Sequence, residues 1–333
     1  MSKKHQRRPA SSRPALTLSP RGWAIVAILA AAATIGLVVW LARQPESITP
    51  TSFAVGDVAY CRISPQFAKA MGYTESSILS TASRQKGLVI FDPPASADGE
   101  PVNVYQHPTW DDAGYLSAPV TDKFGNIYVA PSPRVSLLDN PPEQQNTIYK
   151  VDTEAGVMAE LIKLPAAAPL SPDNPFGILG LAYDCDTHSL YASSVAGSTR
   201  TKEAGRIIRI DLSTREIASQ FENTDAFGLD VFNGTTGKRL YFGAARASEV
   251  RSVPLDAKGD FTGKPRVEFS MAGLGAEGDE KARRIIFNSA TMLVRGMEFE
   301  FNLIATSERQ QTEYQLRYDT SLDAWKPLQN YGP

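Results

Sequence analysis

Histidine, cysteine and excess positive charge are all scarce in this sequence, which has three histidines and two cysteines among 333 residues. Only His107 and His188 follow the long apolar run near the N-terminus, and no G-x-S-x-G motif is present, so a Ser-His-Asp triad has few residues to draw on. The formal net charge is −2. Nucleic-acid-binding domains typically carry a strongly basic surface, and we therefore expect no nucleic-acid partner.

One long uncharged run is present, from Gly22 to Ala42. As a helix, at about 1.5 Å per residue, it spans about 30 Å, the thickness of a bilayer's hydrocarbon core. Trp23 and Trp40 lie near its ends, where indole rings prefer the membrane interface. The alternative is a cleaved signal peptide, whose apolar region normally has about 7–15 residues before a small-residue cleavage site. Arg43-Gln44-Pro45-Glu46 follows the run instead, so we predict an uncleaved transmembrane helix.

The charges on the two sides of this run differ. Only Arg43 follows it closely, whereas six basic residues and no acidic residue precede it: Lys3, Lys4, Arg7, Arg8, Arg13 and Arg21. The positive-inside rule then places the N-terminus in the cytoplasm. We expect a disordered basic tail (1–21), a single-pass signal-anchor in the lipid bilayer of the plasma or inner membrane (22–42), a linker (43–54) and a periplasmic or extracellular domain (55–333).

A strand pattern recurs through the outer domain. In five places an apolar strand such as Leu190-Tyr191-Ala192-Ser193 is followed by a second strand that ends in aspartate, and the spacing is 45 to 63 residues. These aspartates are Asp92, Asp152, Asp211, Asp256 and Asp319. Because an Asp before a tight turn accepts hydrogen bonds from backbone N–H groups two residues on, we expect them to be structural.

Four short antiparallel strands repeated in this way are typical of the blades of a β-propeller. A sandwich is the alternative, but it does not predict the same strand order and terminal aspartate five times. We predict an all-β propeller of five to six four-stranded blades, in which residues 53–76 supply an innermost strand of the first blade or an outer strand of a sixth. In the last blade, Arg295 to Phe299 and Leu303 to Thr306 are predicted as the first two strands.

Two repeats resemble a known group of proteins. Phe227-Gly228-Leu229-Asp230-Val231, with the following Gly237 to Gly243, and Ala118 to Ala130 are similar to the repeats of extracytoplasmic propellers related to gluconolactonases, strictosidine synthases and NHL-repeat proteins. The resemblance implies a propeller, and for the lactonases of the group it also implies a divalent metal such as Ca²⁺ in the central channel. The metal-binding aspartate expected after the second strand is missing here, because these strands end in Ala130-Pro131, Ser193-Ser194 and Gly243-Ala244.

We therefore predict no cofactor and a non-catalytic binding or interaction module, with a Ca²⁺-dependent lactonase or hydrolase as the alternative. Long loops gather on one face of the predicted propeller: Pro131 to Asn146, Pro165 to Pro175, Ser194 to Gly205 and Ala272 to Asn288. Binding residues commonly lie on such loops. Basic residues on this face suggest an anionic or polar ligand, such as a glycan, a peptide or another protein, although solvated loops without a partner have the same composition. The candidate ligand-binding residues are Arg134, Arg206, Arg246, Arg251, Asp230 on an inner strand, and His107 beside Trp110.

The two cysteines, Cys61 and Cys185, both belong to the outer domain. In an oxidising compartment they can form a disulfide that ties the N-terminal strand to a mid-chain turn. The alternative is that Cys61, in the sequence VAYCRI, is a buried apolar residue.

Overall fold

The computed structural model describes residues 53–81, 85–96, 99–132, 138–169, 174–275, 278–301 and 311–329. The predicted tail and membrane helix, most of the predicted linker, and Arg134 lie outside these ranges. Within them, no helix is both long and apolar enough to cross a membrane.

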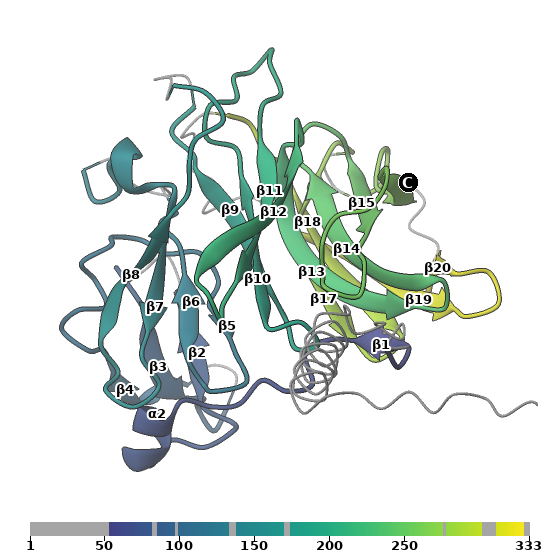
Figure 1. Ribbon diagram of the computed structural model, residues 1–333. Helices are drawn as coiled ribbons and strands as arrows, with labels where there is room; N and C mark the ends of the chain where they lie inside the picture. The colour runs from purple at the N-terminus through teal and green to yellow at the C-terminus, as the bar shows by residue number, and fades with distance from the viewer. Residues whose placement is uncertain are drawn as a thin grey trace, which may run out of the picture. The chain divides into compact units, whose positions relative to one another are not determined.

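The described strands form five antiparallel sheets, the blades of a five-bladed propeller, which we number 1 to 5 in chain order (Figure 1). The predicted all-β propeller is thus confirmed, with the lower of the two predicted blade numbers. Blade 1 contains β2 (Ile78–Ser80), β3 (Val89–Asp92) and β4 (Val102–Tyr105). Blade 2 contains β5 (Val120–Thr121), β6 (Ile127–Val129), β7 (Thr147–Val151) and β8 (Met158–Lys163). Blade 3 contains β9 (Ile178–Asp184), β10 (Ser189–Ser194), β11 (Arg206–Asp211) and β12 (Glu216–Glu222).

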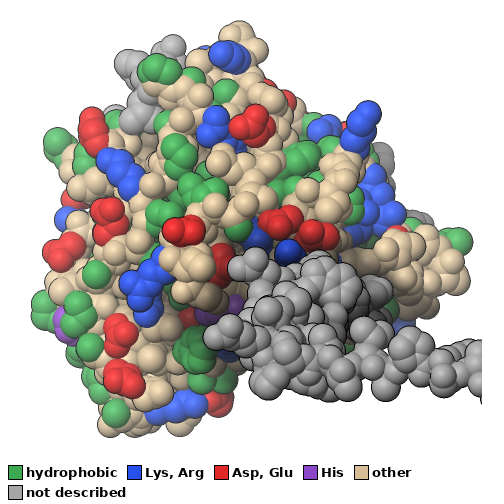
Figure 2. Space-filling model, in the orientation of Figure 1, with side chains coloured by type: hydrophobic (Ala, Val, Ile, Leu, Met, Phe, Trp, Pro, Cys, Tyr) green, Lys and Arg blue, Asp and Glu red, His purple; other side chains and the backbone are tan. Residues whose placement is uncertain are grey.

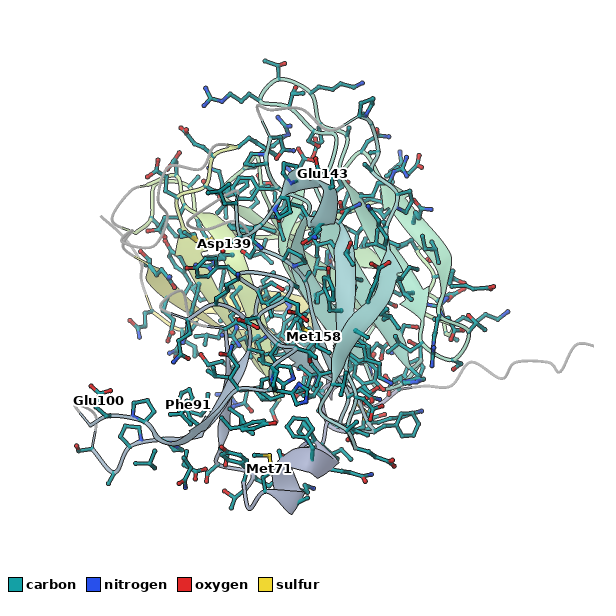
Figure 3. All side chains as sticks on the ribbon, turned by 90° about the vertical axis from the view of Figure 1, so that its left-hand side faces the viewer. Met71, Phe91, Glu100, Asp139, Glu143 and Met158 are labelled. Carbon is teal, nitrogen blue, oxygen red and sulfur yellow. A yellow bond between two sulfur atoms is a disulfide. The ribbon has the colours of Figure 1, made fainter. Side chains whose placement is uncertain are left out.

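Blade 4 contains β13 (Ala226–Gly234), β14 (Gly237–Ala244), β15 (Glu249–Pro254) and β16 (Arg266–Ser270). Blade 5 contains β17 (Lys281–Asn288), β18 (Thr291–Met297), β19 (Thr312–Asp319) and β20 (Ala324–Pro327). The short helix α2 (Gln66–Ala70) precedes blade 1, and the 3₁₀ helix η1 (Pro142–Gln144) lies between β6 and β7. Figure 3 shows the two ends of the propeller, with Met71 after α2 at one end and Glu143 of η1 at the other.

Each blade is held by apolar side chains that pack against its neighbours. In β11, Ile208 and Ile210 belong to the apolar cluster shared with blade 2, whereas Ile207 belongs to the cluster shared with blade 4. All three are fully buried, as expected for a strand that is covered on both faces. Such clusters fill the boundaries between blades 1 and 2, 2 and 3, 3 and 4, and 4 and 5. In the described part of the chain, no cluster of this kind joins blade 5 to blade 1.

The structural role predicted for the repeated aspartates is confirmed at four of the five positions. Asp152, Asp211, Asp256 and Asp319 each accept a hydrogen bond from the backbone N–H two residues on, at 2.8–3.0 Å. Asp92 differs, because its carboxylate accepts hydrogen bonds from Ser77 Oγ and Asn103 Nδ2.

Two details of the predicted strands are wrong. In blade 5 the first two strands are β17 and β18, so β17 lies within the segment 272–288 that was predicted to be a loop, and Arg295 belongs to the second strand. The turn between them, Ser289-Ala290, contains no glycine or proline, and Ser289 itself adopts a positive φ of 52°. Leu303 to Thr306 lies outside the described residues.

The segment before blade 1 also differs from the prediction. Residues 53–76 supply neither an innermost strand of blade 1 nor an outer strand of a sixth blade. Instead, β1 (Gly56–Asp57) pairs with β13 of blade 4, and α2 follows (Figure 1). Among the described residues, blade 1 therefore has three strands, and it lacks the innermost one.

Candidate binding site in the central channel

A cavity of about 570 Å³ lies at one end of the central channel. Residues from all five blades line it: Ile78 and Leu79 in blade 1, Thr121 in blade 2, Leu179 in blade 3, Phe227 in blade 4, and Arg284 in blade 5. Leu179, Phe227 and Arg284 stand in the first half of their strands. The cavity is thus at the end of the propeller from which the long connections emerge, the face on which a ligand was predicted.

Aromatic side chains form one part of the lining. Phe227 lies against Phe299, with ring centroids 4.7 Å apart, and Phe176 contacts the same ring at 5.3 Å. These residues belong to one buried apolar cluster contributed by blades 3, 4 and 5. The strands that carry them approach closely at Gly228, where a Cβ atom would lie 2.6 Å from the carbonyl oxygen of Arg283.

Three arginines form the other part of the lining. Arg283 and Arg284 belong to β17, and Arg295 belongs to β18. Arg284 pairs directly with Arg295 across the two strands, and Arg283 is the extra residue of a bulge. Like charges opposite one another on neighbouring strands destabilise a sheet. The sequence therefore places a local excess of positive charge at this cavity.

These guanidinium groups are only partly neutralised. Arg295 Nε lies 3.3 Å from Glu313 Oε2 in an exposed ion pair. Arg284 has no hydrogen-bond or ion-pair partner among the described residues, although it is accessible to solvent. Protein atoms surround its side chain, and this partial loss of water, together with the charge of Arg295, lowers the pKa of Arg284. Over the face drawn in Figure 2, by contrast, acidic and basic side chains are interspersed.

Asp230 lies deeper, in the middle of β13. Its carboxylate accepts hydrogen bonds from the backbone N–H of Val231 at 2.9 Å and of Phe287, in blade 5, at 3.2 Å. Burial raises the pKa of Asp230 to about 6, against the opposing effects of the Arg62 charge and the two hydrogen bonds. Asp230 therefore connects two blades and changes charge in a mildly acidic medium.

Replacing Asp230 with asparagine should change how stability depends on pH. The folded-state pKa of Asp230 lies above its ordinary value of 3.8, so its contribution to stability is fully present below pH 3.8 and is lost as the pH rises through 6. Between pH 5 and pH 7.5 the free energy of unfolding of the wild type should fall by about 1 kcal/mol, whereas that of the Asp230→Asn variant should not show this fall. Urea unfolding of both proteins at the two pH values measures this difference.

A control separates this titration from a simple loss of hydrogen bonding. The asparagine amide cannot accept from both backbone N–H groups, and the resulting loss of stability should be the same at every pH. In the wild type, the amide resonance of Phe287 should titrate near pH 6, because its N–H donates to Asp230. Parallel pH profiles for the two proteins would contradict the assigned pKa.

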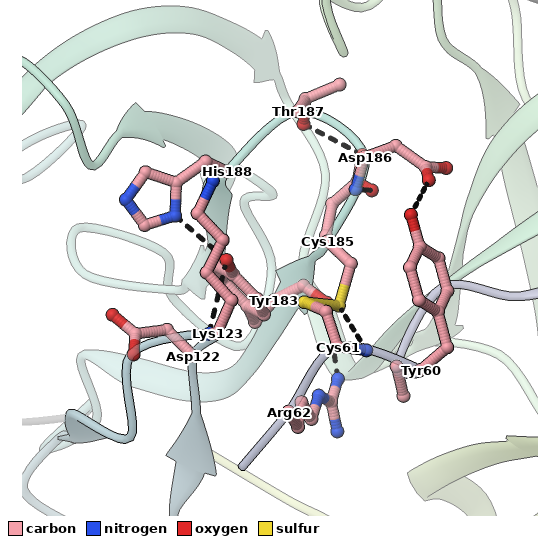
Figure 4. The surroundings of a disulfide bond; sticks show 12 residues. Tyr60, Cys61, Arg62, Asp122, Lys123, Tyr183, Cys185, Asp186, Thr187 and His188 are labelled. Carbon is pink, nitrogen blue, oxygen red and sulfur yellow. Dashed lines mark hydrogen bonds between the residues drawn. A yellow bond between two sulfur atoms is a disulfide. The ribbon is translucent and has the colours of Figure 1, made fainter.

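The N-terminal segment, residues 53–65, crosses the opposite end of the channel. Asp57 Oδ2 accepts a hydrogen bond from the backbone of Ser289 in blade 5, and β1 pairs with blade 4. Cys61 forms a disulfide with Cys185 of blade 3, so of the two predicted alternatives the structure has the disulfide (Figure 4). Ile63 N–H donates to the carbonyl of Asp122 in blade 2 at 3.4 Å. This segment therefore contacts four blades on the short-turn face.

Arg62 belongs to the same segment. Its Nη2 donates to the carbonyl of Tyr183 at 3.2 Å (Figure 4), its charge acts on Asp230, and its buried Nε has no partner among the described residues. The propeller thus has an arginine-rich cavity at one end of the channel, and the charge of Arg62 acts on Asp230 from the N-terminal segment.

The remaining predicted ligand-binding arginines are engaged elsewhere. Arg206 forms an ion pair with Glu222 at 3.8 Å, and Arg251 forms one with Glu249 at 2.7 Å. Arg246 Nε lies 2.5 Å from Asp225, its other nitrogens donate to three backbone carbonyls, and its guanidinium stacks on Phe301. The structure does not bring these side chains together in the cavity.

His107 and Trp110 lie together, with ring centroids 6.3 Å apart, but Trp110 belongs to the apolar core between blades 1 and 2 and His107 is half-buried beside it. Trp110 is fully buried, and its indole N–H donates to the carbonyl of Gly156 at 2.7 Å. His107 Nδ1 lies 2.9 Å from Thr109 Oγ1. This pair supports the packing of the turn that precedes blade 2.

The three cavity arginines were not among the candidate ligand-binding residues. The signal for them was available in the two apolar runs of RIIFNSATMLVRGM, Ile285 to Phe287 and Met292 to Val294. Read as a hairpin, this pattern places Arg284 and Arg295 opposite one another. The stretches that the structure describes contain no group of three or more His, Cys, Asp or Glu side chains suited to holding a metal ion.

No protein-family model matches this chain, and no curated protein matches it in sequence. Solved structures with a similar course of chain include the calcium-binding protein regucalcin from Agrobacterium tumefaciens strain C58, which is 15% identical, with a TM-score of 0.44 over 84% of this chain and 78% of that chain. The luciferin-regenerating enzyme is 10% identical, with a TM-score of 0.44 over 73% of this chain and 74% of that chain. An auxiliary nutrient binding protein from Bacteroides thetaiotaomicron is 11% identical, with a TM-score of 0.43 over 82% of this chain and 57% of that chain. At these values the likeness assigns no activity or ligand, and the five-bladed propeller rests on the chain's own sheets.

Proposed function

We propose that this chain is a membrane-tethered, extracytoplasmic binding propeller that takes an organic anion into the cavity of its central channel. The observation that supports this proposal is the pair Arg284 and Arg295. The two side chains face each other across neighbouring strands at a cavity, and Arg284 has no acceptor among the described residues.

An anion would relieve an unfavourable arrangement. Like charges directly opposite in a sheet cost about 0.2–1 kcal/mol, and a carboxylate, phosphate or sulfate between the guanidinium groups removes this repulsion. The planar guanidinium also suits such groups, because it can donate two parallel hydrogen bonds. The partial loss of water that lowers the pKa of Arg284 strengthens these charge-assisted bonds.

The same cavity favours a ligand with an apolar body. Phe176, Phe227 and Phe299 form an apolar part of its lining, whereas the arginines form a charged part. Its volume of about 570 Å³ falls within the range of about 300–1,000 Å³ that is usual for small-molecule sites. We therefore assign the site to an amphipathic anion rather than to an inorganic ion.

The tether and the compartment rest on separate support. The run from Gly22 to Ala42 has the length and composition of a membrane span, and basic residues precede it. The Cys61–Cys185 disulfide is compatible with an oxidising compartment outside the cytoplasm. A propeller in this position would bind its ligand close to the outer surface of the membrane.

Replacing Arg284 with glutamine should weaken anion binding at least tenfold, because one of the two opposed guanidinium groups is lost. Calorimetric titration of the full chain in detergent with phenylphosphonate, at constant ionic strength, measures this affinity. Arg317→Gln is the matched control, since Arg317 is exposed on β19 and is not part of the cavity lining. Equal affinities for the wild type and Arg284→Gln would contradict the proposed site, and Ca²⁺-dependent hydrolysis of a lactone would favour an enzyme instead.

A further inference from the structure

The N-terminal segment enters the propeller on the short-turn face. The described residues begin at Phe53, whose ring centre lies 4.2 Å from Lys238 Nζ in β14, and β1 then pairs with the last residues of β13. Ten residues, 43–52, separate Phe53 from the end of the apolar run. A chain extends by at most about 3.6 Å per residue, so this link reaches no more than about 36 Å. The nine residues of β13 alone measure about 30 Å. A tether through the apolar run therefore holds the short-turn face closer to the membrane than the long-loop face, where the cavity lies.

An aromatic patch, made of Tyr60, Ile63 and Phe124, lies on this short-turn face around the turn between β9 and β10. Tyr60 donates a hydrogen bond to Asp186 of that turn at 2.5 Å (Figure 4), and the ring of Phe124 contacts the ring of His188, with centroids 5.3 Å apart. Ile63 lies beside them, because its backbone N–H donates to the carbonyl two residues before Phe124. The three side chains are 69%, 42% and 52% exposed, respectively. Exposed apolar side chains that gather in one place mark an interaction surface.

Basic and neutral polar groups border this patch. Lys123 is exposed, and its Nζ lies 5.3 Å from the centre of the Phe124 ring. Arg215 is exposed on the same face, in the turn between β11 and β12. Burial and the charge of Lys123 lower the pKa of His188, so that its ring is uncharged at neutral pH. The carboxylate of Asp186 is only 6% exposed, and the patch therefore presents rings and cationic groups to its surroundings.

This composition suits the interface of a lipid bilayer. Aromatic side chains prefer the boundary between the headgroups and the acyl chains, and nearby lysine and arginine are attracted to anionic headgroups. A protein partner would also cover such side chains, but the bilayer is the surface beside which a tether of this length holds this face.

We propose that the aromatic patch rests in the headgroup boundary of an anionic bilayer. This inference rests on the membrane tether of the proposed function and adds an orientation to it. The cavity at the other end of the channel then opens toward the aqueous compartment, from which its ligand would enter.

The test uses the full chain in vesicles of equal parts phosphatidylglycerol and phosphatidylcholine, with bromine near the top of the phosphatidylcholine acyl chains. Bromine quenches a tryptophan only at close range. The tryptophan added by Phe124→Trp, measured as the difference from the wild type, should lose at least half of its fluorescence. Thr201→Trp is the matched control, because Thr201 is exposed in the loop between β10 and β11 on the long-loop face. Its added tryptophan should lose less than a tenth.

A second substitution separates contact from mere proximity. Adding Ile63→Glu to the Phe124→Trp variant should reduce this quenching at least twofold, because a carboxylate in the patch is repelled by anionic headgroups. Val267→Glu is the control, since Val267 is 52% exposed on β16, away from the patch, and this substitution should leave the quenching unchanged. Equal quenching with and without Ile63→Glu would overturn the contact.

The outcomes distinguish the patch from the tether. Trp23 and Trp40 belong to the predicted membrane span, whereas Trp110 and Trp325 are buried in the propeller, so quenching of the wild type itself reports the tether. If the wild type is quenched but Phe124→Trp behaves like Thr201→Trp, the tether stands and the contact is overturned. If the wild type is not quenched, the tether fails and the contact fails with it. Protection of the added tryptophan from aqueous acrylamide without quenching by bromine would make a second copy of this chain the occupant, and the bilayer would be rejected.

Discussion

Removing the Cys61–Cys185 disulfide should lower the free energy of unfolding by about 2–5 kcal/mol. The two cysteines are 124 residues apart in the sequence, and a cross-link that closes so long a loop strongly restricts the unfolded chain. Urea unfolding of the oxidised protein and of the Cys61→Ser/Cys185→Ser variant measures the difference.

The loss should also have a local consequence. The disulfide holds the N-terminal segment against the turn between β9 and β10, where Tyr60 also donates a hydrogen bond to Asp186 at 2.5 Å. Without it, we expect trypsin to cleave after Arg62 faster than it does in the oxidised protein. Tyr60→Phe is the control, since it removes that hydrogen bond but leaves the disulfide intact. The same hydrogen bond contributes to raising the pKa of Tyr60 to about 12. Identical unfolding midpoints and cleavage patterns with and without the disulfide would show that the segment is held by its other contacts.

The fold could be predicted because each blade repeats the same pattern of strands and turns. Apolar strands such as RIIRID are buried on both faces, and an aspartate then accepts hydrogen bonds in the following turn. Both features are local, so the strand and its terminal aspartate are visible in the sequence at five places, and the turn hydrogen bond is present at four of them. The assignment failed at the turn Ser289-Ala290, because no glycine or proline marks it and the adjacent Arg283-Arg284 has the composition of a loop.

The course of the segment before blade 1 could not be predicted for a different reason. The segment 53–76 could pair with any of several sheet edges, and its local sequence does not indicate which one. In the structure that choice is made by contacts that are distant in the sequence: Asp57 with Ser289, and Cys61 with Cys185. A two-residue strand such as β1 carries too little pattern of its own to predict its partner.

The candidate site shows the same limit. Charge alone identified Arg206, Arg246 and Arg251, but each is neutralised by a carboxylate, which comes from the neighbouring strand, from a loop and from the same strand, respectively. The presence of a partner depends on the three-dimensional arrangement. Asp230 was selected because it lies on an inner strand; in the structure it connects blades 4 and 5, burial raises its pKa, and its role in binding stays a prediction.

Replacing Lys238 with methionine should lower the free energy of unfolding by about 3–5 kcal/mol, because a buried ion pair is broken by the loss of one partner. The side chain of Lys238 is 1% exposed, and its Nζ lies 2.6 Å from Asp184 and 2.8 Å from Asp186. These two carboxylates are 0% and 6% exposed. The variant therefore leaves two buried carboxylates without their cation. It also removes the contact between the ammonium group and the Phe53 ring, whose centre lies 4.2 Å away.

The ion pair joins three parts of the molecule. Lys238 comes from β14 of blade 4, and Phe53 comes from the N-terminal segment. In blade 3, Asp184 is the last residue of β9 and Asp186 lies in the turn between β9 and β10. Burial opposes ionisation of Asp186, but hydrogen bonds from Asn233, Lys238 and Tyr60 outweigh it and lower its pKa. The carboxylate is therefore charged at neutral pH and depends on Lys238.

A double-mutant cycle identifies the buried charge as the cause. Combined with Asp184→Asn, the Lys238→Met substitution should cost much less than it does alone, since one of the unpaired charges is already gone. Lys326→Met is the matched control, because Lys326 pairs with Asp319 at 2.6 Å but is 59% exposed, and its loss should leave the unfolding midpoint unchanged. If Lys238→Met and Lys326→Met destabilise the protein equally, the buried carboxylates must be satisfied by their remaining hydrogen bonds from Asn233, Thr187 and Tyr60 rather than by the lysine.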